Sequence, residues 1–363
     1  MTRRVAAVVE QCWHQVPGGT ATSTVRTLEG IQAAGEWSVA GIAAFHRGPA
    51  SPMATPTVPV THLRLGRRVL YEAWHRFRRP ALPRSVGAVD VVHATGGVIP
   101  PTGGVPLVVT VNDLAFLHRP EHFTTHGVRF MTRSFELAKA EAAAVIVPSE
   151  VTAEDCCAHG LDAERIHVVP LGVIAQAVTE ADRSRVRATY NLPESFVLWL
   201  GAAEPRKNLD RLVAAMDTNP DVALVLAGSP GWGVDVERLV SASPNVRHIG
   251  AVPDADLAPL YDAATVFVFP SLLEGFGMPV LEAMAQGTPV ITSAGTATAE
   301  VAGEAARLIN PMSEEEIGTA IRELLVDPIQ QMAMIERGRR QASALSWAKT
   351  AAATTAVYES VLR

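Results

Sequence analysis

The sequence alternates short, unbroken apolar runs with longer segments of helical periodicity, and few folds satisfy that pattern. Runs typical of strands buried on both faces are RVAAVVE, PLVVTVND, FVLWLGA and TVFVFPS. Segments with helical spacing, such as NLDRLVAAM and LAPLYDAA, lie between such runs. The alternation predicts an α/β fold with doubly wound parallel sheets. Because crossovers between parallel strands are right-handed, the carboxyl ends of the strands meet at one edge, where ligands bind.

The length of the chain predicts two domains rather than one. It has 363 residues, of which 48% are hydrophobic, and these suffice to fill two cores. We predict a first domain over residues 1–174 and a second domain over residues 175–345. Residues 346–363 are predicted to form a helix that packs back on the first domain, with Trp347 and Tyr358 among the docking side chains.

Charge and cysteine content exclude several classes of function. A net charge of −6 argues against a nucleic-acid partner. No apolar run reaches the roughly 18 residues that a membrane-spanning helix needs. The three cysteines, Cys12, Cys156 and Cys157, show no metal-binding spacing and fit a reduced compartment. The expected localisation is therefore cytoplasmic.

The stretch EGFGMPVLEAMAQGTP, residues 274–289, predicts a strand–turn–helix unit. Gly275 and Gly277 permit a tight turn in which the backbone approaches a ligand closely. Pro279 stands where a helix would begin, and Gly287 stands just past its end. The amino end of this helix would favour an anion.

Two glutamates flank this turn. Glu282 lies about one turn inside the helix, where its carboxylate can accept hydrogen bonds from a ribose diol. Glu274 precedes the turn and can accept hydrogen bonds from a sugar beyond the phosphates. A nucleotide-sugar has this order of diol, diphosphate and sugar. The alternative is a capped strand–turn–helix with two solvated glutamates.

Two further loops carry groups that suit a diphosphate. The stretch WLGAAEPRKNLDRL places Arg206 and Lys207 after a predicted strand, with Asn208 as an expected helix N-cap. Fixed cations there would stabilise a leaving diphosphate more than the ground state. A pair of ordinary surface cations is the alternative. The stretch VPGGTATSTVRTL, with Gly18 and Gly19, is a weaker candidate for backbone approach to phosphate.

These stretches, in this order and almost from end to end, resemble family 4 of the retaining glycosyltransferases. The resemblance implies the GT-B fold, in which two Rossmann-like domains face a deep cleft. It also implies a nucleotide-sugar as co-substrate, with no cofactor and no metal. The Glu-x7-Glu signature of that family matches Glu274 and Glu282. By this resemblance Glu282 binds the donor ribose and Glu274 contacts the transferred sugar.

The resemblance carries over to other positions of the donor site. Lys207 matches the diphosphate-binding lysine, and backbone N–H groups from Gly275 through Phe276 and Gly277 to Met278 would hold sugar and phosphates. The glycine pair Gly18 and Gly19 matches the one that approaches the diphosphate from the other domain. Val252 falls where the backbone of the family reads the nucleobase.

Two positions depart from the common pattern of the family. Ala202 stands where many members carry arginine, and Arg206 is the expected replacement for that charge. Asn112 stands where many members carry a histidine close to the reacting sugar, so we count Asn112 among the catalytic candidates. Asn112 can hydrogen-bond but cannot take a charge. Its alternative role is that of a plain strand-end cap.

The implied mechanism retains the anomeric configuration without an assigned nucleophile. In a front-face route the leaving phosphate oxygen takes the proton of the acceptor, while Arg206, Lys207 and the helix N-terminus hold the diphosphate. The pair Asp254 and Asp256 has metal-like spacing, but we interpret these residues as an N-cap and a first-turn acid. Among the histidines of the first domain, His93 and His118 are candidates for contact with the acceptor, although satisfied loop or strand-end histidines are the commoner case.

The resemblance implies a hexosyltransferase. GDP-mannose is the preferred donor, because the stretches EPRKN and GSPGWG resemble those of mannosyltransferase-like members, and UDP-glucose and UDP-N-acetylglucosamine stay open. The acceptor class stays open among a glycan, a lipid-linked molecule and a small molecule. The alternatives are a relative that binds nucleotide-sugar without turnover, or another GT-B enzyme such as an epimerase or phosphorylase. The basic segment 63–79 is either a core-packed helix or a peripheral membrane contact, with Leu63, Leu70, Trp74 and Phe77 near one helical face.

Overall fold

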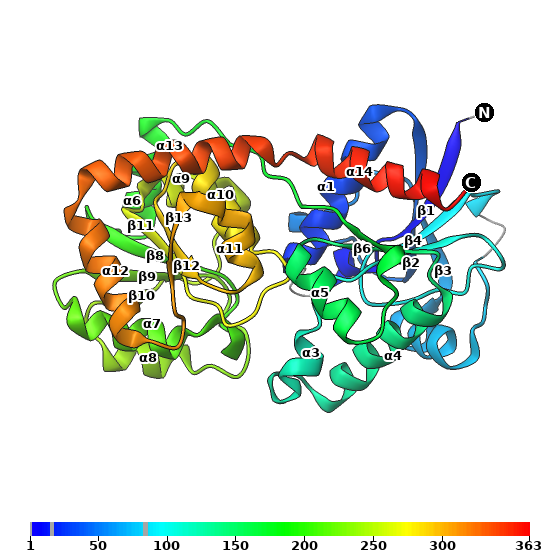
Figure 1. Cartoon of the computed structure of the whole chain (residues 1–363), viewed down its shortest axis with the longest axis horizontal. Coiled ribbons are helices and arrows are strands. Elements are labelled where there is room, and N and C mark those ends of the chain that lie inside the picture. The colour runs from blue at the N-terminus through cyan, green and yellow to red at the C-terminus, as the bar shows by residue number, and fades with distance from the viewer. Residues whose placement is uncertain (1, 15–17, 83–85) are drawn as a thin grey trace. The chain divides into compact units, whose positions relative to one another are not determined.

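The computed structural model describes residues 2–14, 18–82 and 86–363, which form two compact units. The first unit holds residues up to Gly172 together with Trp347–Arg363, and the second holds Val173–Ser346. Each unit is built on one sheet, and every strand pairing among the described residues is parallel (Figure 1). The predicted fold class of two doubly wound parallel sheets is therefore confirmed.

The first unit has a seven-stranded sheet in the order β3-β2-β1-β4-β5-β6-β7. Its strands are β1 (Arg3–Val8), β2 (Trp37–Phe45), β3 (Val60–Gly66), β4 (Val91–Ala94), β5 (Leu107–Thr110), β6 (Ala144–Val147) and β7 (Ile166–Val168). Its helices are α1 (Gly18–Ala34), α2 (Arg67–Glu72), α3 (Ala115–His118), α4 (Thr125–Glu141), α5 (Glu150–Ala158) and α14 (Trp347–Ser360). At the centre, Val5 pairs with Val39 on one side and Val91 on the other, and all three are buried.

The second unit has a six-stranded sheet in the order β10-β9-β8-β11-β12-β13. Its strands are β8 (Phe196–Leu200), β9 (Ala223–Ala227), β10 (Val246–His248), β11 (Val266–Phe269), β12 (Val290–Ser293) and β13 (Ala306–Ile309). Its helices are α6 (Glu180–Thr189), α7 (Leu209–Ala215), α8 (Val236–Ala242), α9 (Asp254–Ala263), α10 (Met278–Gln286), α11 (Ala297–Ala302), α12 (Glu314–Val326) and α13 (Pro328–Ala344). In Figure 1 this sheet lies between α7, α8 and α12 on one side and α9, α10 and α13 on the other.

Each sheet has a point where the strand order reverses. In the first unit the order departs in opposite directions from β1 and β4, and in the second unit from β8 and β11. Loops that follow the two central strands diverge there and leave room for a ligand. The fold thus places the segments after β1 and β4, and those after β8 and β11, where ligands of such sheets bind.

The C-terminal helix α14 belongs to the first unit. Gly30 of α1 lets it approach closely, because a Cβ there would lie 2.8 Å from the Cβ of Ala351. Tyr358 is fully buried against Trp37, with ring centroids 5.1 Å apart. Val357 is also part of this core. Close helix packing and aromatic burial together fix the end of the chain on the first unit.

The segment 63–79 is not one amphipathic helix. Residues up to Gly66 complete strand β3, and the helical part begins only at Arg67. Leu70 and Trp74 lie in the core of the first unit, whereas Phe77 is 66% exposed. The expectation of a single helical face was wrong, because edge pairing with β2 takes the first residues of the segment into the sheet.

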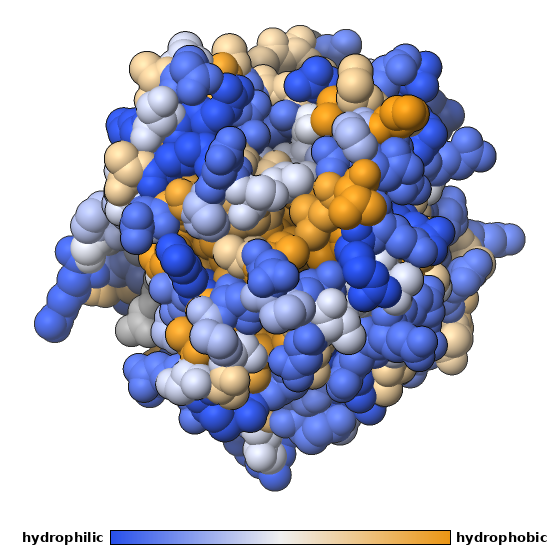
Figure 2. Space-filling model, turned by 90° about the vertical axis from the view of Figure 1, so that its left-hand side faces the viewer, coloured by the Kyte–Doolittle hydropathy of each residue, from blue (hydrophilic) through white to orange (hydrophobic). Residues whose placement is uncertain are grey.

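Figure 2 looks onto the second unit and shows apolar residues gathered on this face among hydrophilic ones. Strongly exposed apolar side chains of this unit include Val326, Ile329 and Met332, near the junction of α12 and α13. Of the helices in the described ranges, none combines the length and the apolarity that crossing a bilayer requires.

Two loops at the carboxyl edge of the second sheet pack backbone against backbone. The Gly201 amide donates to Ala227, and the Ala203 amide donates to Ser229. Gly228 has a φ of +127°, and a Cβ on it would lie 1.9 Å from the Gly201 carbonyl oxygen. Since no side chain fits there, the loop after β9 supports the loop after β8 directly.

Replacing Gly228 with alanine tests this packing. The substitution combines an unfavourable positive φ with a clash against backbone, so we expect a loss of about 2–5 kcal/mol in the free energy of unfolding. Gly250→Ala is the matched control, because Gly250 has a φ of +76° with nothing within 4 Å of its Cβ position. It should cost only about 1–2 kcal/mol. Equal denaturation midpoints for the two variants would contradict the packing argument.

Candidate active site

The residues that the sequence singled out in the second unit follow the two strands at its reversal point. Arg206 and Lys207 lie in a short 3-10 helix (Pro205–Lys207) after β8. Glu274 and the turn up to Gly277 follow β11. Neighbouring parallel strands therefore bring these two loops, some 67 residues apart in sequence, to one edge of the sheet.

Asn208 fastens the loop after β8. It adopts a left-handed conformation with φ of 62°, and its side chain does not cap α7 as expected. Its amide nitrogen instead donates to the Pro270 carbonyl at 3.0 Å and the Pro311 carbonyl at 2.7 Å. The difference has a physical reason: in this conformation the side chain satisfies two carbonyls, one just after β11 and one after β13. The loop is thereby tied to the strand that leads to Glu274.

Glu274 forms a buried ion-pair cluster with both cations. Its Oε2 accepts from Arg206 Nη1 at 2.9 Å, and its Oε1 accepts from Lys207 Nζ. Lys207 is only 7% exposed, and its Nζ lies 4.6 Å from the centroid of the Phe269 ring. The Arg206 Nε also donates to Glu204 at 2.8 Å. The two cations are thus fixed by carboxylates and an aromatic face rather than by solvent.

Burial and charge act in opposite directions on the pKa values of this cluster. Burial alone would raise the pKa of Glu274, but Arg206 and Lys207 outweigh it and hold that pKa at about 2. Burial lowers the pKa of Lys207, and the Glu274 charge partly offsets this shift. Removing one member of such a buried pair leaves an uncompensated charge, which is strongly destabilising. Glu274 is therefore an anion across the physiological range.

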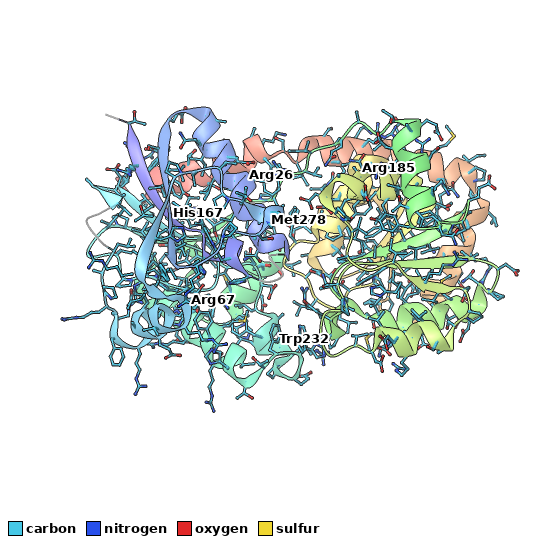
Figure 3. All side chains as sticks on the ribbon, turned by 180° about the vertical axis from the view of Figure 1, so that it is seen from behind. Arg26, Arg67, His167, Arg185, Trp232 and Met278 are labelled. Carbon is cyan, nitrogen blue, oxygen red and sulfur yellow. The ribbon has the colours of Figure 1, made fainter. Side chains whose placement is uncertain are left out.

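The turn after Glu274 presents the amino end of α10. Gly277 has a φ of +100°, and a Cβ on it would lie 2.6 Å from Thr298 Cγ2 on α11. Phe276 is buried beside it, and α10 begins at Met278, labelled in Figure 3. No side chain caps this end of the helix. Backbone N–H groups at the amino end of a helix favour an anion.

The helix bounds follow the sequence prediction closely. Pro279 occupies the first turn, and Gly287 ends the helix in a left-handed conformation with φ of +81°. Both positions use the residue type that their backbone geometry prefers. This local agreement arises because the signals for the start and end of a helix lie within the helix itself.

Glu282 lies one turn inside α10 and has a partner that the sequence did not indicate. The hydroxyl of Tyr261, a fully buried residue of α9, donates to Glu282 Oε2 at 2.9 Å. Burial raises the pKa of Glu282, while the hydrogen bond from Tyr261 opposes that shift. Tyr261 therefore orients the carboxylate and favours its ionised form.

Val252 lies at the same edge of the sheet. It is buried in the segment between β10 and α9. Nearby, the carbonyl of Gly250 accepts from the Gly228 amide at 2.7 Å, which joins this segment to the loop after β9. The segment before α9 is thus part of the same set of strand-end loops as Arg206 and Glu274.

Gly18, Gly19 and Asn112 belong to the first unit. Gly18 and Gly19 open helix α1, and a Cβ on Gly18 would meet nothing within 4 Å. The rest of that Gly-Gly loop, residues 15–17, lies outside the described residues. Asn112 follows β5, and its carbonyl lies 3.5 Å from the Thr152 hydroxyl. The structure brings Arg206, Lys207 and Glu274 together, whereas the roles of these three residues toward the donor stay predictions.

Two histidines that were candidates for acceptor contact have protein partners. His93 is buried between Tyr358, whose hydroxyl lies 2.7 Å from Nδ1, and Thr110, whose hydroxyl lies 2.8 Å from Nε2. Burial lowers the pKa of His93 to about 3, so it is neutral. His118 Nε2 lies 2.8 Å from Asp155. Both follow the commoner pattern of a histidine satisfied by its neighbours.

One group of side chains has metal-ligand geometry that the sequence did not reveal. The ligand atoms of His118, Asp155 and His159 lie within 4.8 Å of one another. His159 Nδ1 lies 3.1 Å from the Asp155 carboxylate, so the three residues also satisfy one another. They tie the end of α3 to the end of α5. The contact between His118 and Asp155 joins residues that lie 37 positions apart in the sequence, and no local sequence signal indicates it.

Of the pair Asp254 and Asp256, Asp256 lies in the first turn of α9 as expected, whereas Asp254 is not the N-cap. Pro253 occupies the N-cap of α9, and Asp254 is the first helical residue. Asp256 pairs with Arg185 of α6, labelled in Figure 3, and accepts from the Tyr190 hydroxyl at 2.8 Å. Asp254 is therefore a second acid in the first turn, where it complements the helix dipole. The Asp256 carboxylate is engaged in packing α6 against α9.

Two sequence families match the two parts of the chain. The family described as Glycosyltransferase Family 4 matches residues 17–176. The family described as Glycosyl transferases group 1 matches residues 181–341, the part that carries the Arg206, Lys207 and Glu274 cluster.

Two curated relatives are mannosyltransferases by name. The O-antigen chain mannosyltransferase B of Escherichia coli is 32% identical over 265 residues, which cover 69% of this chain and 70% of the relative. The MMP alpha-(1->4)-mannosyltransferase of Mycolicibacterium hassiacum is 34% identical over 209 residues, covering 55% of this chain and 49% of that protein. The chain thus spans about half the length of the second relative and over two thirds of the first.

A solved structure shares the whole architecture. The sucrose-phosphate synthase from Thermosynechococcus elongatus matches with a TM-score of 0.76 over 99% of this chain and 98% of that chain, at 24% identity. At that identity the likeness shows the fold, which is GT-B. Together with the two family matches and the E. coli relative, it shows that this chain belongs to the family 4 type of glycosyltransferase.

Proposed function

We propose that the protein is a retaining, metal-independent hexosyltransferase that uses a nucleotide-sugar, with mannose from GDP-mannose preferred. The observation that carries this proposal is the buried cluster of Arg206, Lys207 and Glu274 beside the amino end of α10. Two relatives named as mannosyltransferases, at 32% and 34% identity, support the choice of sugar.

The cluster suits a diphosphate leaving group. As the bond between the anomeric carbon and the phosphate oxygen breaks, negative charge grows on the diphosphate. Arg206, Lys207 and the N–H groups at the start of α10 are fixed in advance, so they stabilise that charge without reorganising. In the proposed front-face step, the acceptor oxygen bonds to the anomeric carbon on the face that the phosphate leaves. The acceptor proton passes to the departing phosphate oxygen.

Each glutamate has a proposed role at one end of the donor. Glu282, oriented by Tyr261, accepts hydrogen bonds from the ribose diol. Glu274 accepts hydrogen bonds from the hexose and holds the two cations in place. The backbone around Val252 contacts the base. Gly18, Gly19 and Asn112 are further candidates for contact with the donor.

A panel of nucleotide-sugars tests the proposed function. We expect GDP-mannose to be hydrolysed slowly without acceptor, to raise the melting temperature most, and to give a product with the donor's anomeric configuration by NMR. A chelator should leave the rate unchanged. Lys207→Met should lower kcat/KM by about 10²–10³-fold, the usual loss for one preorganised donor.

Arg238→Met is the matched control, because Arg238 pairs with Asp210 on the exposed surface of the same unit. Its rate should equal that of the unmodified protein. Binding of a donor with no turnover of any would support instead a nucleotide-sugar-binding relative. Inversion of the anomeric centre would contradict the front-face step.

Replacing Glu274 with glutamine separates its two proposed roles. The variant removes the anion that occupies both cations, so free GDP should bind about tenfold or more tightly, because like charge next to phosphate is unfavourable. Transfer should fall, because the hexose loses its acceptor. Calorimetric GDP affinity and turnover are measured side by side, with Glu237→Gln on exposed helix α8 as control. Unchanged GDP affinity together with unchanged transfer in Glu274→Gln would contradict both proposed roles of Glu274.

Tyr261→Phe tests the carboxylate that is proposed to hold the ribose. Burial raises the pKa of Glu282 and the Tyr261 hydroxyl lowers it, so the variant should raise that pKa further. Only the ionised carboxylate accepts both diol hydrogen bonds. Donor affinity should fall as the pH drops below the pKa of Glu282. Because this pKa is higher in the variant, the variant should lose donor affinity at a higher pH than the unmodified protein does.

The matched control is Tyr190→Phe, because the Tyr190 hydroxyl donates to Asp256 instead. Its profile of donor dissociation constant against pH should follow the unmodified protein. If Tyr261→Phe and Tyr190→Phe give the same profile, Glu282 does not bind the donor.

A further inference from the structure

Three side chains of the first unit, His118, Asp155 and His159, form a group that the proposed function does not use. His118 ends α3, Asp155 lies in the last turn of α5, and His159 is the residue that follows α5. The ligand atoms of the three lie within 4.8 Å of one another. Among the residues that the structure describes, no other three histidine, cysteine or acidic side chains come this close.

Both imidazole rings approach the same carboxylate oxygen. Asp155 Oδ1 lies 2.8 Å from His118 Nε2 and 3.1 Å from His159 Nδ1. Two ligand atoms of a tetrahedral zinc site are about 3.3 Å apart, because each lies about 2.0–2.1 Å from the metal. Two of the three ligand distances are therefore within about 0.5 Å of those in a zinc site. A metal ion would replace the protons that the ring nitrogens direct at the carboxylate.

The backbone fixes the three residues, while their side chains stay open to water. Cys156, next to Asp155, is fully buried, and Phe116 of α3 is buried as well. Gly160, with a φ of +86°, turns the chain directly after His159. The three ligand side chains are between 22% and 40% exposed. A metal ion can therefore enter from solution, and water can complete its coordination.

Charges around the group leave the carboxylate available to a cation. Lys139 Nζ donates to the His159 carbonyl at 3.3 Å and pairs with Glu136 at 2.7 Å. The lysine charge is thus offset by a carboxylate other than that of Asp155. Asp155 supplies a negative charge between the two imidazoles, which attracts a divalent cation.

The ligand types select the class of metal. Imidazole nitrogen suits zinc, copper, nickel and iron, whereas magnesium and calcium prefer oxygen ligands. Zinc often takes three protein ligands and a water molecule. We propose that His118, Asp155 and His159 bind a first-row transition-metal cation that fastens the end of α3 to the end of α5. The ion has no part in the proposed transfer, so a chelator should remove it without changing the rate.

Titration of zinc into the full chain, stripped of metal beforehand, tests this site. Calorimetry should show one zinc ion bound at the group. His118→Gln and His159→Gln should each weaken this binding by about 10²-fold or more, because even the loss of an outer-shell partner of a metal site costs roughly 10–100-fold. Glutamine keeps a hydrogen-bond donor toward Asp155, so thermal melting without zinc should show an intact fold in both variants.

The matched control is His126→Gln, because His126 is an exposed histidine of α4 outside the group. This variant should bind zinc as the unmodified protein does. Zinc should also slow backbone amide exchange in residues 115–118 of the unmodified protein and of the control, because it fastens α3. The same amides should not respond to zinc in His118→Gln.

The outcomes decide the inference without reference to the proposed function. A failure of the unmodified protein to bind zinc would overturn the site, and so would equal zinc affinity in His118→Gln, His159→Gln and the unmodified protein. Zinc bound at the group with unchanged amide exchange in α3 would overturn the fastening. None of these measurements contains a donor, so they hold whether or not any nucleotide-sugar is turned over.

Discussion

The carboxylate of Glu274, held between two cations inside the second unit, is the interaction on which the proposed chemistry depends. Burial by itself would neutralise Glu274, and Arg206 with Lys207 reverses that tendency. Burial likewise acts against the charge of Lys207 and is offset by the carboxylate. Each charge is thus maintained by the others. A cluster of this kind holds three charges in a largely buried place, where a bound anion can take over the contacts that the cations make with Glu274.

The backbone around the cluster keeps it in place. The Asn208 side chain donates to the Pro270 carbonyl after β11 and so holds the loop that carries Arg206 and Lys207. Gly228 lets the loop after β9 pack directly against the loop after β8, with no side chain between them. Gly277 does the same for the turn before α10, which rests on Thr298. Positioning is therefore achieved by close packing of the loops at the reversal point of the sheet, with the backbone itself as one partner in each contact. Such contacts tolerate few substitutions but leave amide groups exposed to a ligand.

The sequence predicted features whose signals are local. Unbroken apolar runs identified buried strands, and the glycines and proline around α10 identified its ends, because each signal lies within the element it specifies. Contacts between residues distant in sequence were missed. Tyr261 is 21 residues from Glu282, and Asn208 is 103 residues from Pro311. Edge pairing with β2 drew Leu63 into a strand, although its spacing to Leu70 also suited a helix. Which of these distant residues come into contact is determined by the folded sheet and not by the local sequence.

A structure of the protein with an intact nucleotide-sugar tests the central claim most directly. The account predicts diphosphate oxygens within hydrogen-bond distance of Lys207 Nζ and the Arg206 guanidinium, about 2.7–2.9 Å. The Glu274 carboxylate should then contact hydroxyls of the hexose, and Glu282 the ribose diol. A diphosphate bound away from both cations, with the Glu274 ion pairs unchanged and solvent around Glu282, would contradict the account.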